Sequence, residues 1–471
     1  MVLPSAVSFA DLWDRIGDAP TWLVIAGVVG VLAAVAIVAG AVRRLWRRNP
    51  RAGLVAAGAA TAGAAAVVVV AAILADKPAD VSNPDAPFAA AEKPTVKLVP
   101  WPLYGFDPER TRYLPSARVK PPFRVAWRFN ARKLVEYSPI VVDGTLYGIN
   151  NNGTAFAINR ENGRLKWRRD VATLNASAPA FLDGRLYVAN LAPGQVQALN
   201  AANGRTIWLT PLPGRTESSP VIAGNKVLVG CECGILFALN RRTGRTIWST
   251  EIGGEIKGAP ALEGGIAYVG AYGGTVAAVR VADGSVKWRS GAQSAGLGQV
   301  GNFYATPTVA FGRVYVGNTD GRMYSFEKGS GALAWSHSTG DYVYSAAVAA
   351  DTKTADPTIY FGSYDGTFYA LDARSGGVRW TKPAGAAVSG AASVIGEVVY
   401  FANLRKTRTI GFDVKNGNRV FTFYDGAYNP VISDGELLYV TGKKWIYGLR
   451  PSKESPRKPK VFGRNLPPRH R

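Results

Sequence analysis

Histidine, cysteine and methionine are almost absent, since the 471 residues contain only two of each. The histidines are His337 and His470, and the cysteines are Cys231 and Cys233. A zinc site needs several imidazole or thiolate ligands, a Ser–His–Asp triad needs a histidine between its partners, and haem attachment needs Cys-x-x-Cys-His. This inventory excludes those classes. We therefore predict no catalytic residue, no metal site and no bound cofactor.

A tryptophan, by contrast, returns at intervals of 40 to 47 residues through most of the chain. Phenylalanine takes its place in the last copy. A period near forty, made of short apolar runs and glycine turns, is typical of a β-propeller with one four-stranded blade per repeat. We expect these aromatic side chains to dock neighbouring blades: Trp127, Trp167, Trp208, Trp248, Trp288, Trp335, Trp380 and Phe421.

Each repeat ends with a polar residue, a glycine four positions later and the aromatic residue four positions after that. An Asn or Asp side chain binds turn backbone and glycine accepts positive φ, so this spacing predicts a hairpin before the outermost strand. The glycines are Gly163, Gly204, Gly244, Gly284, Gly331, Gly376 and Gly417.

Counting repeats predicts eight blades, with seven as the alternative. The run 123–129 is an outermost strand without its three inner strands, and three strands after Phe421 lack an outer fourth. Joining them closes a last blade with strands from both ends of the chain, which removes an exposed sheet edge. The predicted fold class is an all-β, eight-bladed propeller preceded by a two-helix transmembrane hairpin.

The repeat resembles that of the pyrroloquinoline-quinone-like (PQQ-like) propeller family, whose blades carry Ala-x-Asp-x-x-x-Gly-x-x-x-Trp. Ala157 to Trp167, Ala198 to Trp208 and Ala370 to Trp380 match this pattern. The family includes quinone-dependent dehydrogenases and non-enzymatic members, among them a periplasmic lipoprotein that assists outer-membrane protein assembly. The resemblance implies the fold over residues 123–450 and leaves the activity open.

The amino-terminal region contains two uncharged apolar runs, each long enough to span the ~30 Å hydrocarbon core of a bilayer. Five arginines lie between them and should stay in the cytoplasm, which places the propeller on the extracytoplasmic side of the cell membrane. A cleaved signal peptide or a single span is the alternative. The predicted organisation is an interfacial segment (1–20), transmembrane helices (21–42 and 52–75) around a basic loop (43–51), a linker (76–122), the propeller (123–450) and a disordered basic tail (451–471).

The linker is rich in proline, alanine and charge, and we expect it to have little structure of its own. Two of its stretches, Trp101 to Tyr104 and Tyr113-Leu114, are expected to pack against the propeller.

The net charge of +22 predicts an electrostatic partner, such as an anionic membrane surface or cell wall. Nucleic acid is not expected, because the compartment is wrong and no recognition motif is present. Cys231 and Cys233 fall at a turn between a second and a third strand. For an exported chain we expect them to form a disulfide, with free thiols or a redox or metal role as alternatives.

Loops between blades and turns between second and third strands share one face of a propeller. Aromatic residues gather in these segments, which indicates recognition, although tyrosines at blade turns also serve as packing caps. The predicted ligand-binding face comprises Tyr137, Glu217, Lys257, Tyr272, Tyr304, Asp341, Tyr344, Tyr364 and Tyr428.

Two functions remain in competition. The first is a membrane-anchored binding or scaffolding module for a protein, peptide or envelope polymer, without enzymatic activity. The second, implied by the family resemblance, is a quinone- and calcium-dependent dehydrogenase; a sensor ectodomain is a further alternative. The propeller region leaves little room for the insertions that build the active sites of the longer dehydrogenases. We therefore favour the binding module, whose partner and oligomeric state the sequence does not identify.

Overall fold

The computed structural model describes residues 80–83, 85–88, 100–115, 119–294, 300–405, 407–426, 428 and 430–453. The predicted transmembrane hairpin and most of the basic tail lie outside these residues. Within the described part of the chain, no helix has the length and apolar character needed to cross a bilayer.

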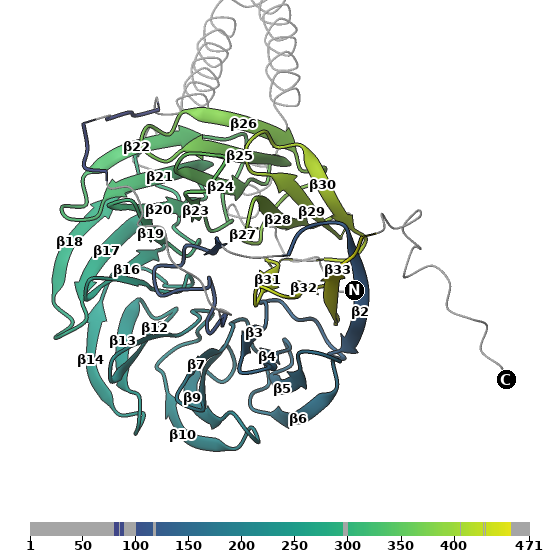
Figure 1. Ribbon diagram of the computed structural model, residues 1–471. Coiled ribbons are helices and arrows are strands. Elements are labelled where there is room, and N and C mark those ends of the chain that lie inside the picture. Colours follow the sequence, from purple (N-terminus) through teal and green to yellow (C-terminus); the bar gives the residue numbers. More distant parts are fainter. Residues whose placement is uncertain are drawn as a thin grey trace, which may run out of the picture. The chain divides into compact units, whose positions relative to one another are not determined.

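The described residues form eight sheets arranged around a common centre, each with four antiparallel strands (Figure 1). Seven follow the chain, four strands at a time from the axis outward. Blade 1 contains β3 (Ile140–Val142), β4 (Thr145–Ile149), β5 (Thr154–Asn159) and β6 (Leu165–Asp170), and blade 2 contains β7 (Ala180–Leu182), β8 (Arg185–Asn190), β9 (Gln195–Asn200) and β10 (Thr206–Pro211). Blade 3 contains β11 (Val221–Ala223), β12 (Lys226–Gly230), β13 (Ile235–Asn240) and β14 (Thr246–Glu251), and blade 4 contains β15 (Ala261–Glu263), β16 (Ile266–Ala271), β17 (Thr275–Arg280) and β18 (Val286–Gly291).

The remaining blades continue in the same order. Blade 5 contains β19 (Thr308–Ala310), β20 (Arg313–Gly317), β21 (Arg322–Glu327) and β22 (Leu333–Ser338). Blade 6 contains β23 (Val348–Ala350), β24 (Thr358–Gly362), β25 (Thr367–Asp372) and β26 (Val378–Pro383). Blade 7 contains β27 (Ser393–Ile395), β28 (Val398–Asn403), β29 (Arg408–Asp413) and β30 (Arg419–Phe423).

Blade 8 is closed by both ends of the described chain. Its three inner strands are β31 (Ile432–Ser433), β32 (Leu438–Thr441) and β33 (Trp445–Pro451), and its outermost strand is β2 (Phe123–Asn130). Strand β2 pairs antiparallel with β33, for example Phe129 with Ile446. The prediction of eight four-stranded blades with this closure is confirmed.

The repeat motif works across two blades rather than within one. Asn240 accepts hydrogen bonds on Oδ1 from the backbone of Arg242 (2.9 Å) and Thr243 (3.1 Å), which closes the turn before β14. Gly244 in that turn packs under Trp208 of the preceding blade, and Trp208 Nε1 donates to Arg241 O at 3.1 Å. The motif therefore joins each blade to the previous one through an aromatic ring.

The six other tryptophans of the period, for which docking is predicted, repeat this hydrogen bond to the next blade. Their acceptors are the carbonyl oxygens of Arg160, Ala201, Val281, Lys328, Ala373 and Val414, at 2.8 to 3.1 Å. Phe421 has no N–H to donate. It packs edge-on against Phe123 and Tyr400 instead, with centroids 5.4 and 5.6 Å apart.

The segment 100–115 lies along the innermost strands, although it belongs to the predicted linker. Its strand β1 (Tyr113–Leu114) pairs parallel with β27, and Trp101 forms a bridge with Val141 of β3. The expected packing of these two stretches is confirmed. Its carbonyl oxygens also accept from innermost-strand N–H groups of blades 2, 4, 5, 6 and 7, namely those of Phe181, Leu262, Val309, Ala349 and Val394. We call this stretch the axial segment.

Candidate functional site

A cluster of charged residues lies where three blades meet. Lys257, between β14 and β15, places Nζ 3.3 Å from Glu217 Oε1, 3.5 Å from Glu232 Oε1 and 3.6 Å from Glu255 Oε2. The ammonium group also lies 5.6 Å from the centre of the Tyr272 ring. The side chains of Lys257, Glu217 and Glu232 are only 13 to 18% exposed, so the ion pairs are partly shielded from water.

This environment changes the protonation equilibria of the cluster. Burial raises the pKa of Glu232, against the lowering effect of Lys257, and nearby Glu217 raises it further. Burial alone would lower the pKa of Lys257, but the carboxylates of Glu217 and Glu232 raise it above its usual value. Lys257 therefore stays charged at neutral pH and holds the acidic groups together.

Tyrosines continue the site from the charged cluster onto blades 5 and 6. The Tyr304 hydroxyl donates to Glu217 Oε2 at 2.9 Å. Its ring contacts Tyr344 edge-on at 5.0 Å, and Tyr344 contacts Tyr342 at 5.6 Å and Tyr364 at 5.0 Å. All four rings are half-buried, so each offers part of its surface to solvent. We call the combined surface the Lys257–tyrosine face: Glu217, Glu232, Lys257, Tyr272, Tyr304, Tyr342, Tyr344 and Tyr364.

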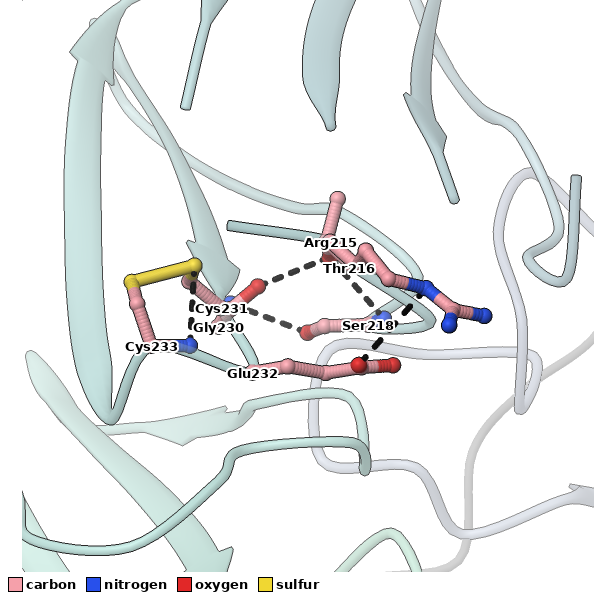
Figure 2. Close-up of a disulfide and its surroundings, with 7 residues drawn as sticks. All are labelled: Arg215, Thr216, Ser218, Gly230, Cys231, Glu232 and Cys233. Carbon is pink, nitrogen blue, oxygen red and sulfur yellow. Dashed lines mark hydrogen bonds and ion pairs between the residues drawn. A yellow bond between two sulfur atoms is a disulfide. The ribbon is translucent and has the colours of Figure 1, made fainter. Parts of the chain in front are cut away.

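The turn that carries Glu232 is closed by a disulfide between Cys231 and Cys233 (Figure 2). Cys231 is fully buried, whereas Cys233 is exposed. The backbone N–H of Glu232 donates to Arg215 O at 2.9 Å, and its carboxylate lies 3.8 Å from Arg215 Nε. The bridged turn thus holds Glu232 toward Lys257.

The structure brings together six of the nine predicted face residues: Glu217, Lys257, Tyr272, Tyr304, Tyr344 and Tyr364. Tyr137 contacts Tyr104 of the axial segment, with ring centroids 5.3 Å apart, and lies near enough to Tyr304 and Glu217 for them to add to the raising effect of burial on its pKa. Asp341 accepts from the N–H of Tyr342 at 2.6 Å, a contact within its own loop. Tyr428 is 39% exposed, and the described residues place no ring against it.

Sequence reasoning missed Glu232 and Arg215. Aligning Cys231–Gly234 with Ala271–Gly274 sets Glu232 at the position of Tyr272, so the repeat itself contained the signal. Arg215 lies two residues before Glu217 and corresponds to Glu255 of the next blade, and the N–H of Glu232 donates to Arg215 O as that of Tyr272 donates to Glu255 O, so the repeat contained this signal too. Among the described residues, no group of three His, Cys, Asp or Glu side chains is placed to hold a metal ion.

Eight four-stranded blades, docked through a repeated aromatic motif, define the class of PQQ-like repeat propellers. The family model described as outer membrane protein assembly factor BamB (PQQ_2) matches residues 124–263 and 253–455. The chain belongs to this family.

Individual relatives match only part of the chain. BamB of Yersinia pestis is 30% identical over 104 residues, which is 22% of this chain and 25% of that protein. The 1-butanol dehydrogenase (cytochrome c) of Thauera butanivorans is 26% identical over 153 residues, 28% of this chain and 22% of the dehydrogenase. The crystal structure of BamB from Moraxella catarrhalis aligns with a TM-score of 0.59 at 17% identity, over 70% of this chain and 100% of that one. The structural likeness shows the fold.

Replacing Lys257 with methionine should destabilise the protein in a pH-dependent way. The change leaves Glu217 and Glu232 adjacent without the ammonium group that they share, and only the more exposed Arg215 remains beside Glu232. We expect a loss of about 1–3 kcal/mol at pH 7, reduced from the fully buried case by partial exposure. The pKa of Glu232 is already raised, so near its pKa the native state binds more protons than the unfolded state. Stability should therefore recover as the pH falls from 7 toward 5, as measured by urea unfolding.

Lys226→Met is the matched control. Lys226 is also half-buried, but its contact is with Asn225 Oδ1 at 3.5 Å and involves no carboxylate. Its stability difference from the parent protein should stay constant over the same pH range. Parallel pH profiles for the two variants would contradict the predicted role of Lys257.

Proposed function

We propose that this chain is a membrane-anchored, extracytoplasmic propeller that binds a protein partner of the cell envelope through the Lys257–tyrosine face. The two apolar runs before residue 76 support the anchor, and the arginines between them support the orientation. Membership of the BamB family supports a scaffolding role, since several relatives have the printed name of assembly factors.

The observation that carries the proposal is the continuous group of half-buried tyrosines Tyr304, Tyr344, Tyr342 and Tyr364. Tyrosine is enriched at protein interfaces because its ring offers a large apolar surface and its hydroxyl a hydrogen bond. Rings that already pack on one another lose little conformational freedom on binding. The surface is therefore prepared for recognition.

Charge indicates what kind of partner segment fits. Glu136, Glu217, Glu232 and Glu255 lie around Lys257 and Arg215, so this part of a strongly basic chain carries an excess of acidic groups. Burial and nearby Glu217 raise the pKa of Glu136, which reflects this local excess. We infer that the bound segment presents a basic residue beside apolar side chains.

A dehydrogenase is the competing function, because dehydrogenases are among the relatives. The family's quinone and calcium require a cluster of acidic and amide oxygen ligands for the metal. Here Glu217 is engaged by Lys257 and Tyr304, and Glu232 by Lys257 and Arg215. The residues of this face do not fit a metal–quinone pair, and we derive no reaction from it.

Photo-crosslinking of the full-length protein in intact cells tests the proposal. A photoreactive phenylalanine at Tyr364 should yield a discrete protein adduct on irradiation. The control position is Leu165 on β6, which is 46% exposed and far from the face in the blade order. External protease should digest residues 123–450 in the same cells after conversion to protoplasts.

Adducts of equal yield at both positions, or none at Tyr364 and Tyr344, would refute the proposed binding face. Heterogeneous, protease-resistant adducts would identify an envelope polymer instead of a protein. Dye-linked alcohol oxidation by the purified protein, after addition of quinone and calcium, would show that the protein is a dehydrogenase and not a binding module.

A further inference from the structure

Two arginines of the axial segment are buried at the centre of the propeller. Arg110 and Arg112 are both 0% exposed. Arg110 is satisfied by carbonyl oxygens: its Nε donates to Pro260 O at 3.0 Å, and its other nitrogens donate to Tyr104, Ser219 and Pro220. Burial lowers the pKa of Arg110 to about 9, so this side chain remains charged at neutral pH.

Only one of the three guanidinium nitrogens of Arg112 donates hydrogen bonds to described residues. Its Nη1 donates to Arg110 O at 2.5 Å, to Thr308 Oγ1 at 3.0 Å and to Ala347 O at 3.3 Å. Its Nε and Nη2 are buried and have no hydrogen-bond partner among the described residues. A buried unsatisfied donor costs about 1–3 kcal/mol, and more when it is charged. Native proteins rarely leave two such donors on one group.

The geometry of these two donors is specific. Nε–H and Nη2–H point from the same edge of the planar guanidinium and lie parallel, which is the arrangement that binds two oxygens of one carboxylate. The Tyr104 ring lies 5.0 Å from Arg112 Cζ and is within cation–π range of the group. The donors without a partner are therefore those of the in-plane edge.

The described residues place no hydrogen-bond acceptor on that edge, although Asp107 lies near enough for the charge of Arg112 to lower the pKa of its carboxyl against the raising effect of burial. The carboxylate of Asp107 accepts from the N–H of Thr111 at 2.7 Å and from its hydroxyl. The hydroxyl of Ser393 is a second buried group without a partner. It belongs to β27, one residue before Val394, whose N–H donates to Arg112 O at 2.9 Å.

We propose that Arg112 Nε–H and Nη2–H bind one small oxyanion of the carboxylate class, the size of formate, acetate or bicarbonate, at the propeller axis. The two-donor edge selects a planar anion with two oxygens, and full burial restricts its size. Such an anion would link the axial segment to the ring as a structural ligand. This site is separate from the Lys257–tyrosine face and does not depend on the proposed function.

Formate-dependent stability of the full-length protein in detergent is the first test. Thermal unfolding is followed while sodium formate replaces a bulky organic sulfonate at constant ionic strength. Ligand binding to the native state raises stability with the logarithm of ligand concentration. Above the dissociation constant we expect the melting temperature to rise by about 2 °C for each tenfold increase in formate.

Two substitutions test whether the paired donors of Arg112, rather than its positive charge alone, bind formate. Arg112→Lys keeps a cation but removes the paired donors, so its melting temperature should not respond to formate. Arg313→Lys is the matched control, because Arg313 is also 0% exposed but its Nε and Nη2 already donate to Pro87 O and Ala86 O, both at 2.7 Å. The control should retain the full response.

Binding of radiolabelled formate to the unsubstituted protein, measured by equilibrium dialysis, keeps the proposal testable if Arg112→Lys does not fold. One saturable site for each chain supports the proposal. Absence of saturable binding to formate, acetate and bicarbonate would overturn it. An equal thermal response in Arg112→Lys, or its loss in Arg313→Lys, would also overturn it, because the anion would then act elsewhere.

Discussion

Replacing Gly244 with alanine is expected to destabilise the protein by about 2–5 kcal/mol. Gly244 has φ +77°, where an L-residue costs about 1–2 kcal/mol. A Cβ there would lie 2.6 Å from Cε3 of Trp208 and 2.7 Å from Thr210 Oγ1. Trp208 is held by its hydrogen bond to Arg241 O, so relieving the overlap moves blade 2 relative to blade 3, at a further cost of about 1–3 kcal/mol.

Gly224→Ala isolates the backbone contribution. Gly224 has φ +56°, but a Cβ built there meets nothing within 4 Å. Its replacement should cost only about 1–2 kcal/mol, for the backbone conformation alone. Urea unfolding of both variants measures the difference. Equal losses would show that contact with Trp208 contributes nothing to the requirement for glycine in the motif.

The propeller architecture could be predicted from the sequence because each repeat has the same turn and docking residues at the same spacing. The spacing from Asn240 to Gly244 to Trp248 predicts a capped turn and an aromatic on the next strand, and the structure shows both. The periodicity does not say which blade receives each ring. That Gly244 packs under Trp208, one repeat earlier, follows from the stacking of adjacent sheets.

Part of the candidate site was also predictable, for the same reason. Glu217, Lys257 and Tyr304 occupy equivalent loops of successive blades, so a correct blade assignment brings them to one face. Tyr428 occupies the corresponding loop before blade 8, yet remains outside the tyrosine group. Loop position alone therefore predicts the face of the disc and not the contacts on it.

The axial segment was the least predictable part. Its composition is that of a linker, and Arg110 and Arg112 are charged residues that usually remain exposed. Their burial depends on carbonyl oxygens such as Pro260 O and Ala347 O, which lie 150 and 235 residues away in sequence. No local pattern encodes contacts of this separation, since the acceptors are ordinary backbone groups of the innermost strands.

Replacing Trp335 with alanine should be the most damaging of the aromatic truncations. Trp335 is 0% exposed, donates to Ala373 O at 3.1 Å and packs against Tyr315, with centroids 5.7 Å apart. Residues 80–83 cover its strand, since Ser82 forms a bridge with Trp335. Full burial places the expected loss at the upper end of about 3–5 kcal/mol. The equivalent change at half-buried Trp248 should fall at the lower end.

Phenylalanine at position 335 distinguishes ring packing from the hydrogen bond. Phe421 occupies the corresponding position of blade 7 without any donor, so the docking pocket of a blade tolerates a smaller ring. Trp335→Phe should therefore keep most of the packing and lose about 1–2 kcal/mol, largely because the hydrogen bond from Trp335 Nε1 is removed, while the Tyr315 hydroxyl still donates to Ala373 O at 3.0 Å. Denaturant unfolding of the three variants gives the order Trp335→Ala, Trp248→Ala, Trp335→Phe from most to least damaging. If Trp335→Phe were as damaging as Trp335→Ala, the hydrogen bond, rather than the packing of an aromatic ring between blades, would account for the contribution of Trp335 to stability.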